Sequence, residues 1–132
     1  MQIGEFSRQT DLTIDTLRYY EEVGLLRPTR TAGNHRQYQA KDIDWVNFLK
    51  RLKQTGMSIR NMQRYAQLRY IGNQTIPERL ILLQKQETQL NDLMVATQAN
   101  LDFLHQKMTT YHEMQESDFE SVSYTHLTLP TN

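Results

Sequence analysis

Three side chains that could contact a nucleic acid stand close together near the start of the chain: Thr16, Arg18 and Tyr19. They offer a hydroxyl, a forked cation and an aromatic hydroxyl, which suit phosphate oxygens and base edges. Ile14 and Leu17, three positions apart, would anchor the same segment on a small core, which indicates a short helix with two different faces. A solvent-exposed helix could carry the same residues, so the neighbouring elements must decide between the two interpretations.

The ends of this helix and the segment before it predict a helix-turn-helix. Thr13 can cap the first turn, and Gly24 lies where a helix would stop. Residues 3–10 indicate an earlier short helix, and residues 10–13 the tight turn between the two. Two such helices, the second of which exposes polar and cationic groups, are typical of a DNA-binding motif. The side chains that we expect to face DNA are therefore Thr13, Thr16, Arg18 and Tyr19.

A basic hairpin is predicted next. Pro28 disfavours another helix, and residues 32–35 contain the Gly and Asn that a tight loop needs. Arg30, Arg36 and Tyr38 lie on its two arms. Beside a recognition helix, such a hairpin is a wing that can hold the DNA backbone next to the groove that the helix enters. A merely solvated hairpin is the plainer alternative, which the concentration of arginines disfavours.

Two more helices are predicted at residues 41–55 and 58–70, since apolar side chains recur there at helical spacing and Ser58 can cap the second. Lys53, in the first of them, could reach a phosphate. After a linker at residues 71–75 the pattern changes, because mostly apolar side chains repeat every seven residues over five heptads. A helix with so narrow a stripe needs a partner, most simply its own copy, while packing back on its own domain is the alternative. The predicted dimer contacts are Leu80, Leu83, Leu90, Met94, Leu101, Leu104 and Met108.

The fold class is therefore mainly α. We expect a winged helix-turn-helix domain at residues 1–70, the linker at 71–75 and a dimerisation helix at 76–115. Residues 116–132 lose the heptad pattern and become rich in hydroxyl side chains, and we expect them to be disordered or foreign to the natural protein.

The charge distribution supports the same division. The net charge is zero, but residues 1–70 hold twelve Lys and Arg against seven Asp and Glu, and the remaining residues hold three against eight. The first half suits a polyanionic partner that the second half would repel.

Several functional classes are disfavoured. The absence of cysteine excludes disulfides and thiolate metal sites, and no apolar run or leader pattern suggests a membrane, so we expect a cytoplasmic protein. No glycine-rich phosphate loop, nucleophile motif or paired carboxylate points to an enzyme. His105 and His112 lie a heptad apart, about 10 Å by helical rise, too far for a shared metal ion. We therefore expect no catalytic residues, no metal and no cofactor.

The residue string 16–21, Thr-Leu-Arg-Tyr-Tyr-Glu, followed by Gly-Leu-Leu at 24–26 and by Arg36 and Tyr38, closely resembles the MerR family of bacterial transcription regulators. The match covers about residues 1–115. Within the family, the chain is most similar to the small, AdhR-like members without a separate effector domain. The resemblance implies a homodimer joined by an antiparallel coiled coil. It also implies a dimer that binds pseudo-palindromic promoter DNA and distorts the spacer so that RNA polymerase can engage. Carried over by position, Thr16, Arg18 and Tyr19 would contact DNA from the recognition helix, Arg36 and Tyr38 from the wing, and Lys53 near the operator centre.

The chain departs from the family in its sensing residues. Metal-, aldehyde- and thiol-responsive members use cysteines, and this chain has none, so its inducing signal is open. A small ligand could lie only beside Met62, Tyr65 and Tyr70, against the partner's coiled coil. Two other functions remain: an excisionase-like architectural DNA-binding protein, which generally lacks a long dimer helix, and a coiled-coil interaction protein whose basic domain binds an acidic protein surface.

Overall fold

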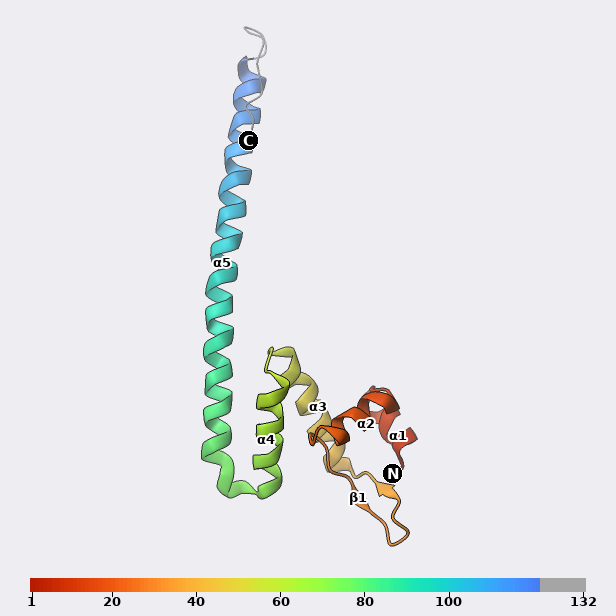
Figure 1. The fold of residues 1–132 in the computed structure, drawn as a ribbon. Helices are drawn as coiled ribbons and strands as arrows, with labels where there is room; N and C mark the ends of the chain where they lie inside the picture. Colours follow the sequence, from red (N-terminus) through yellow and green to blue (C-terminus); the bar gives the residue numbers. More distant parts are fainter. Residues whose placement is uncertain (122–132) are drawn as a thin grey trace. The chain divides into compact units, whose positions relative to one another are not determined.

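The computed structural model of the protein describes residues 1–121. The chain divides into two compact units, Met1–Leu90 and Asn91–Asn132. The first unit contains four helices, a β-hairpin, a 3-10 turn and the start of a long helix, and the described part of the second is the continuation of that helix (Figure 1). This mainly helical, winged architecture confirms the predicted fold class.

The first two helices form the predicted helix-turn-helix. α1 (Ile3–Thr10) ends at Asp11, whose φ of 55° is left-handed, and α2 (Ile14–Glu22) begins after Thr13. The Thr13 hydroxyl oxygen accepts a hydrogen bond from the backbone N–H of Thr16 at 3.1 Å, which satisfies one of the free donors at the helix start. Gly24, with φ of 85°, allows the chain to turn back after α2. The predicted cap and stop of the recognition helix are both confirmed.

The hairpin is short and antiparallel. β1 (Thr29–Arg30) pairs with β2 (Arg36–Gln37), so that Thr29 lies opposite Gln37 and Arg30 opposite Arg36. The loop between the strands contains Asn34 with a positive φ of 62°, a conformation that asparagine tolerates better than most residues. The predicted hairpin is confirmed.

Two helices complete the winged domain. α3 (Ala40–Gln54) and α4 (Ile59–Ile71) are separated by a turn in which Gly56 has φ of 86°. The Ser58 hydroxyl accepts from the N–H of Asn61 at 3.2 Å, so the predicted N-cap of α4 is confirmed.

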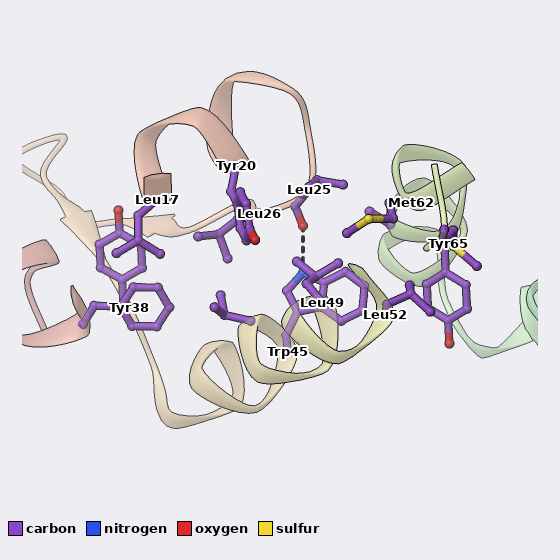
Figure 2. Close-up of a cluster of buried hydrophobic side chains, with 14 residues drawn as sticks. Leu17, Tyr20, Leu25, Leu26, Tyr38, Trp45, Leu49, Leu52, Met62 and Tyr65 are labelled. Atoms are coloured by element: carbon purple, nitrogen blue, oxygen red, sulfur yellow. Dashed lines mark hydrogen bonds between the residues drawn. The ribbon is translucent and has the colours of Figure 1, made fainter. Parts of the chain in front are cut away.

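A single apolar core joins these helices. Phe6 from α1, Leu17 from α2 and Leu49 from α3 are fully buried. Figure 2 shows the α2 and α3 contributions together with Trp45, whose indole N–H donates to the carbonyl of Leu25 at 2.7 Å. This bond supplies a partner for a carbonyl that would otherwise be buried without one.

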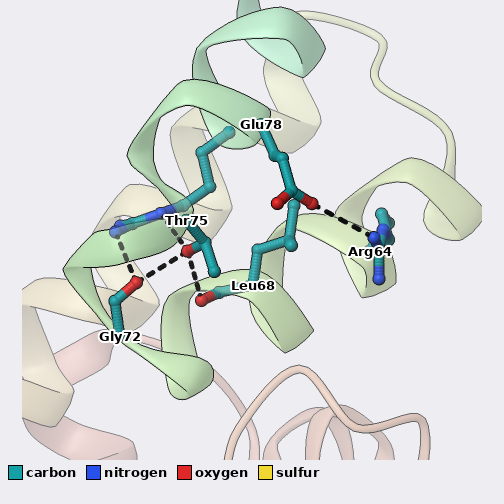
Figure 3. A network of polar contacts seen from close by, with 6 residues as sticks. Arg64, Leu68, Gly72, Thr75 and Glu78 are labelled. Atoms are coloured by element: carbon teal, nitrogen blue, oxygen red, sulfur yellow. Dashed lines mark hydrogen bonds and ion pairs between the residues drawn. The ribbon is translucent and has the colours of Figure 1, made fainter.

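The turn between α4 and α5 is ordered rather than a loose linker. It is a 3-10 turn, η1 (Asn73–Thr75), and α5 (Ile76–Ser121) follows directly. The buried Thr75 hydroxyl bonds with the carbonyls of Leu68 at 2.6 Å and Gly72 at 2.7 Å, as Figure 3 shows. The Arg79 guanidinium donates to Thr75 Oγ1 and to the Gly72 carbonyl, both at 3.2 Å. The beginning of α5 is therefore fixed to the end of α4.

The first turns of α5 pack on the winged domain. Leu82 and Leu83 are partly buried against its core. The Gln86 side chain is buried and donates to the Thr55 carbonyl, just after α3, at 2.7 Å. The alternative in which the heptad helix packs back on its own domain thus describes this part of α5.

α5 is also longer than predicted. It continues through Ser121, so residues 116–121 are helical and not disordered, because helix propensity does not require the apolar stripe to continue. Our expectation for residues 122–132 falls outside the described residues.

Candidate nucleic-acid interface

α2 exposes one side of its surface and buries the other. Leu17 is fully buried and Tyr20 is 5% exposed, and both belong to the core. Arg18 is exposed, Tyr19 is 47% exposed, and Thr16 is half-buried at the start of the helix. The three side chains proposed to contact a nucleic acid therefore reach solvent from one helix that its opposite side fixes to the domain.

The hairpin brings two more arginines to the same place. A groove between α2 and the hairpin is lined by Arg18, Arg30 and Arg36, together with Glu21 and Glu22. The same three arginines border an adjoining hollow near the hairpin tip. Arginine forks suit phosphate geometry, so this groove can bind an anionic backbone. Arg18 and the hairpin arginines, predicted from separate segments, are brought together.

Glu21 connects the recognition helix with the hairpin. Its carboxylate accepts from Arg36 Nε at 2.7 Å and from the Tyr38 hydroxyl at 2.7 Å. The Glu21 side chain is only 11% exposed, whereas that of Arg36 is 44% exposed. Glu21 therefore fixes the hairpin to α2 while the Arg36 guanidinium still reaches solvent. Sequence reasoning missed this role, because a carboxylate in a basic segment carries no signal of its long-range partners.

Tyr38 is not the DNA-facing wing residue that we predicted. It is 1% exposed, and its ring stacks on Phe6 with 4.2 Å between ring centroids. Burial raises the pKa of the Tyr38 phenol, and the hydrogen bond to the Glu21 carboxylate raises it further, because both disfavour the phenolate. The Tyr38 ring points into the core because it stacks on Phe6 of α1, a contact that no local sequence pattern reveals.

The two remaining DNA candidates have different surroundings. Thr13 is exposed, but its hydroxyl also donates to Thr16 Oγ1 at 2.9 Å, so both threonine hydroxyls are engaged in capping α2. Lys53 is exposed in the last turn of α3. Its side chain makes no ion pair or hydrogen bond with the described part of the chain, so the ammonium group is available to a ligand.

The predicted dimer contacts are exposed along α5 with one exception. Leu83 is partly buried in the first unit, against the chain's own core. The others are 39–65% exposed: Leu80, Leu90, Met94, Leu101, Leu104 and Met108.

The proposed small-ligand residues are occupied in packing. Met62 and Tyr65 are 3% and 8% exposed and belong to the core. The Tyr70 hydroxyl accepts from the backbone N–H of Arg27 at 3.0 Å. In the first unit these side chains support the domain instead of lining a cavity.

Within residues 1–121, no three His, Cys, Asp or Glu side chains gather in a way that could hold a metal ion. None of the described helices has the length and apolarity that a membrane crossing requires.

Comparison with known proteins agrees with this geometry. The family model described as "MerR HTH family regulatory protein" matches residues 1–68. An uncharacterized HTH-type transcriptional regulator of Haemophilus influenzae is 35% identical over 99 residues, which cover 74% of this chain and 73% of that protein. The HTH-type transcriptional regulator AdhR of Bacillus subtilis is 36% identical over 91 residues, which cover 68% of this chain and 65% of AdhR.

A solved structure is similar over most of the chain. It is HiNmlR, a MerR family regulator lacking the sensor domain, in a complex with promoter DNA. Its TM-score is 0.68 at 30% identity, and the match covers 87% of this chain and 92% of HiNmlR. With the recognition helix, the basic hairpin and the family match over residues 1–68 in agreement, this chain belongs to the MerR family of helix-turn-helix transcriptional regulators.

Proposed function

We propose that this protein controls transcription by binding promoter DNA as a homodimer. The observation that carries the proposal is the meeting of Arg18 from α2 with Arg30 and Arg36 from the hairpin around one groove. This arrangement supports simultaneous contact with base edges and with the adjoining backbone. The HiNmlR complex with promoter DNA supports the same kind of ligand.

Each side chain has an assigned part. Arg18 reads a base edge in the major groove, where a forked guanidinium can bind the two acceptors of a guanine. Thr16 and Tyr19 contact the DNA beside it, and Thr13 holds the helix start close to a phosphate. Arg30, Arg36 and Lys53 bind the backbone. Tyr38 is excluded from this set by its burial.

α5 provides the dimer interface in this proposal. The apolar side chains that recur every seven residues leave a large exposed stripe, which soluble monomers rarely tolerate. An antiparallel coiled coil of two α5 helices would cover it and hold two winged domains at a fixed spacing. The dimer then bends and untwists the promoter spacer in the cytoplasm so that RNA polymerase can engage. This step deforms the DNA and involves no enzymatic reaction.

The test is selection of DNA from a random pool with the full chain, repeated at two salt concentrations. We expect an inverted repeat with a fixed gap, and Arg18→Ala should lose preference at one base pair of each half-site, at a cost of about 1–3 kcal/mol. Binding that depends on salt and ignores sequence would refute the proposal in favour of an architectural protein. No DNA binding at all would point to protein partners instead.

The dimer is tested separately by sedimentation. Leu101→Asp introduces a charge into the proposed seam and should give a monomer, whereas Gln106→Asp, on the same helix outside the seam, should remain a dimer. Identical oligomeric states for the two variants would exclude this seam.

A further inference from the structure

A second basic groove lies beside the end of the recognition helix. It runs between the end of α2 and α4 and carries three arginines, Arg27, Arg60 and Arg64, with the amide side chains of Gln63 and Gln67. No carboxylate is among the described residues that line it. Five of its seven lining residues carry a guanidinium or an amide, and these donors match the oxygens of a phosphate, so the groove suits an anion.

Contacts between α4 and the segment that follows α2 hold the groove in shape. The Gln63 amide donates to the carbonyl of Val23 at 3.0 Å, which fixes α4 to the end of α2. The Arg27 guanidinium lies over the Tyr70 ring, 4.8 Å from its centroid, and its backbone N–H donates to the Tyr70 hydroxyl. The walls of the groove are thus held by contacts between separate elements of the first unit.

The arginines differ in how free they are. The Arg60 side chain is exposed and makes no ion pair or hydrogen bond with the described residues. Arg64 is paired with Glu78 of α5 at 3.4 Å (Figure 3), but both side chains are more than half exposed, so the pair is weak and can be exchanged for a stronger anion. Two guanidinium groups can therefore turn to a ligand with little loss.

The position of the groove favours DNA over an acidic protein. Its floor includes Val23, whose N–H donates to the carbonyl of Tyr19, so it begins one helical turn from the exposed Tyr19 ring. A protein partner would need an apolar anchor, and the lining offers no exposed aromatic or large aliphatic side chain.

We propose that this groove binds the sugar-phosphate backbone of the operator duplex, outside the contacts made by Arg18 and the hairpin. The inference rests on the proposed function and adds Arg60 and Arg64 as phosphate-binding residues. These contacts strengthen binding to every sequence alike and carry no base preference.

The experiment measures the affinity of the full chain for the selected duplex over a range of salt concentrations. Arg60→Gln and Arg64→Gln are compared with Arg51→Gln, an equal charge change on the exposed side of α3. Each groove variant should flatten the slope of log affinity against log salt by about 0.9, and the double variant by about twice that, with the selected sequence unchanged. Arg51→Gln should keep the slope of the unmodified protein.

Three other outcomes would each contradict the inference. If Arg18→Ala changes sequence preference but the groove variants keep the slope of Arg51→Gln, the groove is no DNA contact and the proposed function still holds. If the groove variants bind DNA normally and fail only in transcription with purified polymerase, the groove binds an acidic protein surface. If the unmodified chain shows no site preference, the proposed function fails and this inference with it.

Discussion

Replacing Glu21 should weaken the winged domain more than its place on a solvated helix suggests. Its carboxylate accepts from the hydroxyl of the buried Tyr38 and from Arg36, both at 2.7 Å. A hydrogen bond to a charged group contributes about 1.5–3 kcal/mol to stability. The Arg36 pair adds less than about 1 kcal/mol, because the arginine side chain is 44% exposed and solvent screens it.

Glu21→Ala should therefore lower the free energy of unfolding by about 2–3 kcal/mol, since it also leaves the Tyr38 hydroxyl without its partner. Glu21→Gln keeps an oxygen acceptor and should cost about half as much. Arg36→Gln removes only the exposed pair and should cost less than about 1 kcal/mol.

Urea unfolding followed by circular dichroism measures these differences, at one protein concentration because dimerisation contributes to stability. A double-mutant cycle of Glu21→Ala with Tyr38→Phe isolates their interaction, which we expect to exceed about 1 kcal/mol. A coupling near zero, with Glu21→Ala no worse than Arg36→Gln, would show that the carboxylate does not hold the hairpin.

Three further outcomes are expected. Trp45→Phe should cost about 1–3 kcal/mol in urea unfolding, because the Leu25 carbonyl loses its indole donor; an effect below about 0.5 kcal/mol would contradict this role. Thr75→Val should destabilise the α4–α5 turn by about 1–2 kcal/mol, while Thr75→Ser keeps the hydroxyl and should unfold nearly as the unmodified protein does. The raised pKa of Tyr38 keeps its phenol protonated in the folded state, whereas the same phenol ionises near pH 10 in the unfolded chain. The contribution of the protonated phenol to stability is therefore complete below about pH 10 and is lost as the pH rises further. Tyr38→Phe should remove part of that alkaline loss in unfolding midpoints measured from neutral to alkaline pH, and an unchanged pH profile would rule it out.

The local signals in the sequence predicted most of the winged domain. Thr13 and Ser58 cap helices because their hydroxyls satisfy backbone donors only three residues away, and Gly24 supplies a positive φ. The exposure of Arg18 and Tyr19 follows from helical periodicity around the buried Leu17. These features depend on a few neighbouring residues, which is why a single sequence reveals them.

Long-range packing set the features that the sequence did not reveal. Tyr38 is buried by Phe6, far earlier in the chain, and so is lost as a DNA contact. Ile59 belongs to the periodic apolar face of α4 but is 43% exposed, because periodicity defines a face and not where its packing partner ends. Gln86 looks like a solvated heptad residue, yet it is buried against the Thr55 carbonyl. Each outcome depends on which elements meet.

The link that Glu21 makes between α2 and the hairpin also has an entropic consequence. A free arginine on a mobile hairpin would lose about 0.5–1.5 kcal/mol of side-chain freedom when it binds a ligand. Arg36 loses much of that freedom when the domain folds, because the Glu21 carboxylate already orients its Nε. The hairpin and α2 thus meet a duplex as one preorganised surface. The entropy of ordering Arg36 is lost when the domain folds and not when it binds DNA.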